Sequence, residues 1–339
     1  MFDFIPDVVF LFAFGLILLI KGGDWFVDAA TSIAKRFKLP ELLIGATVVS
    51  IGTTLPEVMT SAMAAVGGSG GIAYGNAIGS IICNTALIAA VTIAIKPAKA
   101  DRRTIIFPVC TFFAVAIFYA LNAYLVGSFA RWAGIALLLC FIVYMVITVV
   151  NMIKNPAKDE HNDDNEKLEC ELPEDSSKLA IVKDVAVLLF GALVIALGAH
   201  LLVNSATEIA KSLGISDAVI GLTVVALGTS LPELVTAITA LAKGHGALSL
   251  GNIIGANIFN LVLVSGVAVT ISPFEIPASS ILFGHNASLL LDIPVMLTVM
   301  AIMTLPTIIR GKLSRWQGFT LLAIYVSYIA LQFIFVQNV

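Results

Sequence analysis

One segment of this chain occurs twice, as Gly45-Ala-Thr-Val-Val-Ser-Ile-Gly-Thr-Thr-Leu-Pro-Glu57 and, 176 residues later, as Gly221-Leu-Thr-Val-Val-Ala-Leu-Gly-Thr-Ser-Leu-Pro-Glu233. Nine of its 13 positions are identical. The same offset, without a gap, aligns Gly75-Asn-Ala-Ile-Gly-Ser-Ile-Ile-Cys-Asn84 with Gly251-Asn-Ile-Ile-Gly-Ala-Asn-Ile-Phe-Asn260, where six of ten positions match. The chain therefore contains an internal duplication, and both copies carry polar residues within apolar sequence.

The rest of the chain is strongly apolar. Hydrophobic residues make up 59% of its 339 positions and charged residues 12%, and the mean hydropathy is +1.02. Soluble domains carry about 25% charged residues, so this composition predicts a membrane protein. A membrane-spanning helix needs about 20 mostly apolar residues. Ten stretches meet that requirement: 5–34, 41–66, 72–95, 104–124, 131–151, 179–206, 217–242, 247–271, 287–309 and 316–337.

Each copy of the duplication holds five of these predicted spans. Because five is odd, the second copy must enter the bilayer from the side opposite to the first. We therefore predict an all-α membrane protein of ten transmembrane helices in two inverted five-helix repeats, residues 1–151 and 179–339, joined by a linker of residues 152–178. Many secondary transporters have this architecture, and they bind their substrate near the bilayer midplane between the repeats.

The distribution of basic residues predicts the orientation. With the N-terminus outside, 16 lysines and arginines fall on the cytoplasmic side, whereas only Arg131 and Lys211 fall outside and Lys21 is undecided. Cytoplasmic loops carry an excess of Lys and Arg. We therefore predict a multi-pass protein of the cell inner (plasma) membrane, with both termini extracytoplasmic and the linker in the cytoplasm.

The linker contains the most acidic segment of the chain, residues 159–175, which has nine carboxylates and one lysine. A regulatory calcium loop is one interpretation, but the twelve-residue template that begins at Asp163 fails, because Leu168 stands where glycine is required. We interpret the segment as a solvated linker.

A proline and a glutamate follow each other inside both predicted spans of the duplicated segment. Proline lacks the amide that would bond the carbonyl four residues earlier, so Pro56 and Pro232 predict broken helices in spans two and seven. Broken helices at membrane depth occur where backbone is buried in protein or lines a cavity. Glu57 and Glu233 are costly in a bilayer, and spans two, three, seven and eight hold no lysine or arginine to pair with them. The pattern therefore favours ion ligands over interhelical salt bridges.

Spans three and eight provide further polar groups. Asn76, Ser80 and Asn84 recur at intervals of four and so share one helix face, as do Asn252, Ala256 and Asn260. Their oxygens can complete the shell of about six to eight oxygens that Ca²⁺ prefers. Asn and Ser also join membrane helices to one another. We interpret Ser80, Asn84 and Asn260 as ligands, and for Asn76, Asn252 and Asn257 packing or helix capping is equally plausible.

All the predicted ligands are oxygen atoms, which indicates a hard cation such as Ca²⁺ or Na⁺. No histidine or cysteine pair is placed to bind zinc, copper or nickel, and His200, the only histidine well inside a span, lies outside the repeated motifs.

The segments G-T-[ST]-L-P-E and G-N-x-x-G-[SA]-x-x-x-N resemble the two alpha repeats of the sodium/calcium exchanger family, in the cation/calcium exchanger superfamily. The resemblance covers nearly the whole chain and is closest to the short prokaryotic calcium/sodium antiporters. It implies that Glu57 and Glu233 are the central calcium ligands. It further implies backbone carbonyl ligands at Thr53 and Thr229, hydroxyl ligands at Thr54 and Ser230, and third-span ligands at Ser80 and Asn84.

Both repeats depart from well-studied members of that family. Asn260 stands where several have aspartate, and Ala256 stands where they have serine, while Ile81 replaces an asparagine that Asn257 retains in the other repeat. The predicted site thus has two carboxylates rather than three, which leaves the sodium stoichiometry open.

We therefore predict a secondary antiporter that exchanges Ca²⁺ for Na⁺ by alternating access. Proton-coupled cation exchange is the nearest alternative, K⁺ involvement stays open, and a passive cation channel is a second class of function. An intramembrane hydrolase would need an activated nucleophile, but Thr54 and Ser230 have no base in their motifs. The predicted partners are Ca²⁺, Na⁺ and the lipid bilayer. Neither a cofactor nor nucleic acid is expected, and the sequence leaves the oligomeric state open.

Overall fold

The computed structural model describes residues 5–97, 100–154, 178–212, 226–276, 281–282, 285–286 and 288–336. Those residues are almost entirely helical. The first half of the chain forms α1 (Ile5–Arg36), α2 (Glu41–Ile44), the π-helical turn η1 (Gly45–Val49), α3 (Ser50–Val66), α4 (Gly70–Cys83), η2 (Asn84–Ala89), α5 (Ala90–Ile95), α6 (Arg102–Leu121), η3 (Asn122–Val126), the short strand β1 (Ser128–Phe129) and α7 (Arg131–Lys154).

The second half follows the same order of helices. It forms α8 (Lys178–Ser212), α10 (Ala226–Thr229), α11 (Leu231–Ala242), α12 (Gly246–Phe259), η5 (Asn260–Val264), α13 (Ser265–Ile271), β2 (Phe274–Glu275), β3 (Ile281–Leu282), β4 (His285–Asn286), η6 (Ser288–Asp292), α14 (Ile293–Arg310) and α15 (Arg315–Val336). β1 pairs antiparallel with β2, and β3 with β4. The acidic segment 159–175 and residues 217–225 of the predicted seventh span lie outside the described residues.

The described part of the chain holds eight helices that are long and apolar enough to cross a membrane. They begin and end close to the stretches predicted from hydropathy, and α11 is a shorter apolar helix within the predicted seventh span. The prediction of an all-helical membrane protein is therefore confirmed.

Three of these long helices form the buried centre of the bundle. The α12–η5–α13 helix is the most buried, followed by α4–η2–α5 and then α2–η1–α3. Glycines let the helices approach closely, because a Cβ on Gly251 would overlap the carbonyl of Leu42, and a Cβ on Gly45 would meet the carbonyl of Leu248 and the amide of Asn252. The helices that carry the duplicated motifs thus touch backbone to backbone.

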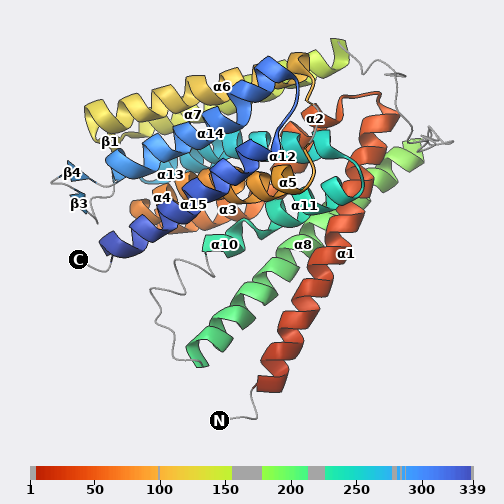
Figure 1. The fold of residues 1–339 in the computed structure, drawn as a ribbon, viewed down its shortest axis with the longest axis horizontal. Coiled ribbons are helices and arrows are strands. Elements are labelled where there is room, and N and C mark those ends of the chain that lie inside the picture. Colours follow the sequence, from red (N-terminus) through yellow and green to blue (C-terminus); the bar gives the residue numbers. More distant parts are fainter. Residues whose placement is uncertain are drawn as a thin grey trace.

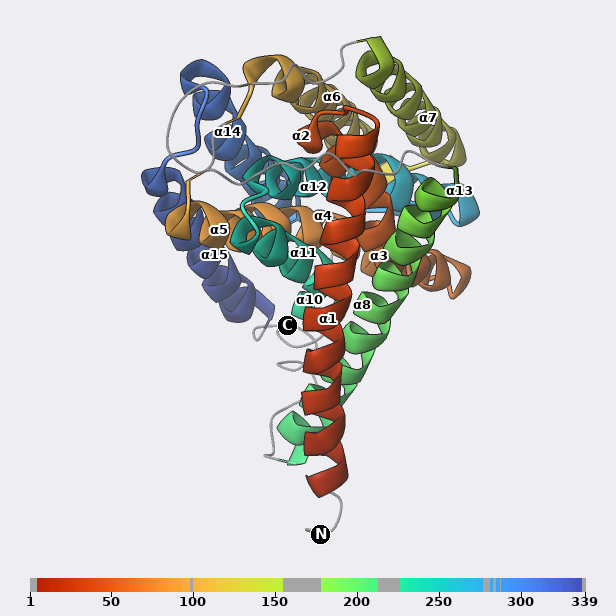
Figure 2. The same ribbon diagram turned by 90° about the vertical axis from the view of Figure 1, so that its right-hand side faces the viewer.

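Two long helices pack against one side of this bundle. In Figure 1, α1 and α8 lie side by side and cross the other helices steeply, and Figure 2 shows them extending beyond the rest of the bundle. At their crossing point Gly15 faces the backbone of Gly198, and Gly198 faces that of Gly15. Arg36 of α1 also pairs with Asp184 of α8, with 2.8 Å between guanidinium nitrogen and carboxylate oxygen. The two helices therefore pack as a pair, and α1 packs in turn along α11.

The predicted break of the second span is wrong in this structure. The chain is helical from Glu41 to Val66, with the π-helical turn η1 near its start and Pro56 inside α3. A proline removes one amide donor but keeps a helical φ, so the carbonyl of Gly52 loses its partner without an interruption. The predicted break of the seventh span is present, because Ser230 leaves the helical region (φ −92°, ψ 7°) and Pro232 lies in the first turn of α11, where proline is tolerated.

Candidate metal-ion site

Two fully buried glutamates form the centre of the candidate site. Glu57 comes from α3 and Glu233 from the first turn of α11, and each side chain is 0% exposed. They lie close enough for their charges to interact. Among the described residues, no oxygen of either carboxylate has a hydrogen-bond partner. Buried carboxylates are normally paired, so two adjacent ones without a partner indicate a place for a cation.

The hydroxyl groups of both repeated motifs lie around these carboxylates. The side chains of Thr53 and Thr54 lie beside Glu233, although without hydrogen-bond geometry. The buried hydroxyls of Thr54 and Ser230 have no partner among the described residues. Thr229 is half-buried at the end of α10, directly before the break at Ser230.

The two predicted asparagine ligands occupy equivalent places. Asn84 is the first residue of η2 and Asn260 the first residue of η5, and both are fully buried. In the described structure, neither amide nitrogen nor amide oxygen of either side chain has a partner. π-helical turns inside α-helices are frequent at functional sites. Ser80 is buried one helical turn before Asn84.

The packing of the helices brings elements of both repeats to this place. η5 of the second repeat packs on α3 and α4 of the first, and η2 of the first packs on α11 and α12 of the second. The structure therefore brings Thr53, Thr54, Glu57 and Glu233 together directly, and it places Ser230 near the Cys83 thiol beside them. It places Ser80, Asn84, Thr229 and Asn260 on elements that border this group.

Buried polar groups without partners are expensive, at about 1–3 kcal/mol each. Six of the nine predicted ligands carry such atoms. They are Thr54, Glu57, Asn84, Ser230, Glu233 and Asn260. The described residues hold no group of three or more His, Cys, Asp or Glu side chains suited to a metal ion. The donor set is therefore two carboxylates with neutral oxygens, which fits a hard cation such as Ca²⁺ or Na⁺.

Two residues at the site were not predicted as members of it. The Cys83 thiol, directly before Asn84, lies near Ser230 and both glutamates. The side-chain oxygen of Asn252 in α12 accepts the hydroxyl of Thr53 at 3.2 Å and lies 3.3 Å from the hydroxyl of Ser50. Asn252 lies eight residues before Asn260, so the sequence placed both on one helix face. A packing role was an equally good interpretation of Asn252 from the sequence alone.

The related Asn76 makes different contacts. Its amide donates to the Glu57 carbonyl at 3.2 Å and to the Ser61 hydroxyl at 2.8 Å. Asn257 donates to the Thr85 hydroxyl at 2.7 Å and is fully buried between α12 and η2. These contacts join neighbouring helices, which supports the packing interpretation of Asn76 and Asn257.

Comparison with known proteins supports the same interpretation. The family model described as "Sodium/calcium exchanger protein" matches residues 8–150 and 183–334. The uncharacterized membrane protein MJ0091 of Methanocaldococcus jannaschii is 36% identical over 94% of this chain and 96% of its own length. The sodium/calcium exchanger MaX1 of Methanosarcina acetivorans is 30% identical over 94% of this chain and 96% of its own length.

Solved structures agree with the sequence relatives. A structure of the sodium-calcium exchanger NCX_Mj, soaked with Na⁺ and Sr²⁺, superposes with a TM-score of 0.78 at 33% identity, covering 96% of this chain and 99% of that one. Other structures of the same exchanger, including one soaked with Na⁺ and Ca²⁺, match with similar scores. The resemblance inferred from the repeated motifs is confirmed: this chain belongs to the sodium/calcium exchanger family.

Proposed function

We propose that this protein is a secondary antiporter that moves Ca²⁺ across the membrane in exchange for Na⁺, by alternating access at one site between two inverted five-helix repeats. The pair of fully buried, unpartnered glutamates carries the proposal. With both ionised, the site holds two negative charges, which balance one Ca²⁺ or two Na⁺.

The proposed ligands are those predicted from the sequence. Glu57 and Glu233 supply charge, Thr54 and Ser230 supply hydroxyl oxygens, and the side chains of Ser80, Asn84 and Asn260 supply neutral oxygens. The backbone carbonyls of Thr53 and Thr229 complete the shell. Support comes from the unsatisfied side-chain atoms at six of these positions. Ca²⁺ takes about six to eight oxygens at flexible geometry, which such a mixed shell provides.

The proposed topology has ten spans. Both termini lie on the outer side of the cell membrane, and the acidic linker lies in the cytoplasm. Its support is the excess of Lys and Arg in the loops that this orientation places inside. Exchange through one site then requires that the site open to one side of the membrane at a time and never to both sides at once.

Flux measurements in proteoliposomes test the proposed coupling. We expect vesicles loaded with Na⁺ to accumulate radioactive Ca²⁺ when the outside contains choline in place of Na⁺. K⁺-loaded vesicles and vesicles with an imposed pH gradient should accumulate little. Uptake that follows only the pH gradient would replace Na⁺ by H⁺ in the mechanism, and uptake that needs no counter-ion would indicate a channel.

A further inference from the structure

Asn252 links the two repeats beside the proposed ion site. It lies in α12, and its side chain is fully buried. Its side-chain oxygen accepts the hydroxyl of Thr53 at 3.2 Å, and its main-chain oxygen accepts the hydroxyl of Ser50 at 2.9 Å. Both donors belong to α3 of the other repeat.

The hydroxyl of Thr53 has a competing acceptor. It lies beside the Glu233 carboxylate, which is a stronger acceptor than an amide oxygen. A hydroxyl has one proton to donate, so the bond to Asn252 directs the Thr53 proton away from the Glu233 oxygens. A carboxylate oxygen that already accepts a hydrogen bond has less electron density to offer a cation.

We propose that Asn252 is a positioning residue for ion binding: it holds the Thr53 hydroxyl so that this group does not compete with the ion for the Glu233 oxygens. Its counterpart Asn76 donates its amide to the Glu57 carbonyl and to Ser61, whereas the amide nitrogen of Asn252 has no partner among the described residues. The two repeats therefore use the same asparagine differently. The proposal rests on the proposed function, in that Glu233 is taken as an ion ligand.

Calcium titration by calorimetry tests this role without depending on the counter-ion. We expect Asn252→Ala to weaken Ca²⁺ binding by about three- to tenfold, the range of one lost hydrogen bond. Asn252→Leu, which keeps the volume and removes the acceptor, should do the same if the alanine variant folds poorly. In a Thr53→Val background, either change should have little further effect, because the competing hydroxyl is gone.

Additive losses in the double variant, or unchanged binding in Asn252→Leu, would refute the positioning role. A parent protein that binds no Ca²⁺ would instead refute the proposed function, so the two failures are distinguishable.

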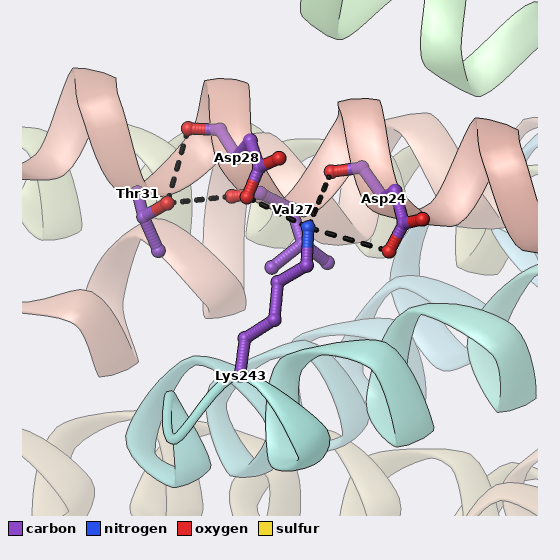
Figure 3. Close-up of polar contacts among 5 residues, drawn as sticks. All are labelled: Asp24, Val27, Asp28, Thr31 and Lys243. Atoms are coloured by element: carbon purple, nitrogen blue, oxygen red, sulfur yellow. Dashed lines mark hydrogen bonds and ion pairs between the residues drawn. The ribbon is translucent and has the colours of Figure 1, made fainter.

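A cluster of ion pairs at the end of α11 holds α1 against the bundle. Lys243 follows α11 directly, and its ammonium lies 2.8 Å from the Asp28 carboxylate and 3.3 Å from that of Asp24. It also donates to the Asp24 carbonyl at 3.2 Å. Figure 3 shows the lysine between these two aspartates, which lie one turn apart on α1. The contact thus ties α1 to the end of α11.

The duplication makes this contact one-sided. At the offset of 176 residues, Lys243 corresponds to Gly67, Asp24 to His200, and Asp28 to Asn204. Gly67 has no side chain. His200 and Asn204 contact each other on α8, with 3.0 Å between the Asn204 amide nitrogen and His200 Nε2. In an inverted-repeat transporter the two repeats exchange conformations when access changes sides. A contact that only one repeat can make therefore stabilises one of the two states.

We infer that the ion pairs of Lys243 with Asp24 and Asp28, which we call the latch, hold α1 against α11. They thereby favour the state in which the ion site is closed to the cytoplasm. The assignment rests on the proposed orientation, which places Lys243 and the end of α11 on the cytoplasmic side. Among the described residues, α1 also has an ion pair with α8, between Arg36 and Asp184, which lies within the α1–α8 pair. It therefore offers a matched control.

Calcium–calcium exchange in oriented vesicles tests the latch and needs no sodium coupling. We expect Lys243→Gln to change the ratio of half-saturating Ca²⁺ on the two sides by about two- to fivefold, with tighter apparent binding from the cytoplasmic side. Arg36→Gln should leave that ratio unchanged. The exchanged pair Lys243→Asp with Asp28→Lys should restore it.

An unchanged ratio in Lys243→Gln, or an equal shift in Arg36→Gln, would refute the latch. A parent protein without Ca²⁺ exchange would refute the proposed function instead.

Discussion

Replacing one site glutamate by glutamine should weaken Ca²⁺ binding far more than Na⁺ binding. The substitution keeps the size of the side chain and removes one charge. Glu57 and Glu233 are fully buried and have no partner among the described residues, so no neighbouring group replaces the lost charge. Removing one member of a buried charge pair costs about 3–5 kcal/mol.

That free energy sets the expected change in affinity. At about 1.4 kcal/mol for each factor of ten, Ca²⁺ affinity should fall roughly 100- to 4,000-fold. Coulomb energy is proportional to the product of the charges, so a monovalent ion should lose about half as much free energy. Na⁺ affinity should therefore fall only about 10- to 60-fold.

Calorimetric titration of purified Glu57→Gln and Glu233→Gln with each ion measures both numbers. Glu275→Gln is the matched control, because Glu275 is exposed in β2. Equal losses for the two ions would show that the substitution disturbs packing rather than charge. A Ca²⁺ affinity within about threefold of the parent would mean that the carboxylate does not contact the ion.

Three further changes test the site and the fold. Asn260→Asp should keep Ca²⁺ binding but make sodium-driven flux steeper between about pH 5 and 8, because a third adjacent carboxylate must hold or release a proton according to ion load; an unchanged profile would mean that Asn260 does not face the ion. Deleting residues 159–175 should leave flux largely intact, since we interpret them as a solvated linker; lost flux in a folded variant would indicate a regulatory role. Gly251→Ala should lower the thermal midpoint of the purified protein, at a cost of about 1–3 kcal/mol, because its Cβ would overlap the Leu42 carbonyl; an unchanged midpoint would contradict the close contact of α12 with α2.

Sequence patterns predicted the features that depend on local composition. Glu57 and Glu233 stood out because an apolar span makes any carboxylate costly, and their burial follows from the same hydropathy. The contact between Asn252 and Thr53 could not be predicted, since it joins residues 199 positions apart and depends on how α12 crosses α3. The backbone conformation at Pro56 and Pro232 could not be predicted from local sequence rules either. The two six-residue motifs differ only at Thr54 and Ser230, yet the chain stays helical at Pro56 and breaks before Pro232.

Positions that are alike in the two repeats form the proposed ion site, whereas a position that differs, such as Lys243, acts on the balance between the two transport states. In the proposed site, Glu57 and Glu233, like Asn84 and Asn260, are the ligands that surround the ion similarly from either repeat. An antiporter also needs its two states to be close in free energy, because a large gap would trap one of them. A partly exposed pair such as Lys243 with Asp28 contributes at most about 1 kcal/mol, which changes the ratio of states about fivefold. A fully buried pair worth about 3–5 kcal/mol would change it by a factor of a hundred or more and slow the cycle. A weak contact in one repeat is therefore suited to setting the resting state while leaving exchange reversible.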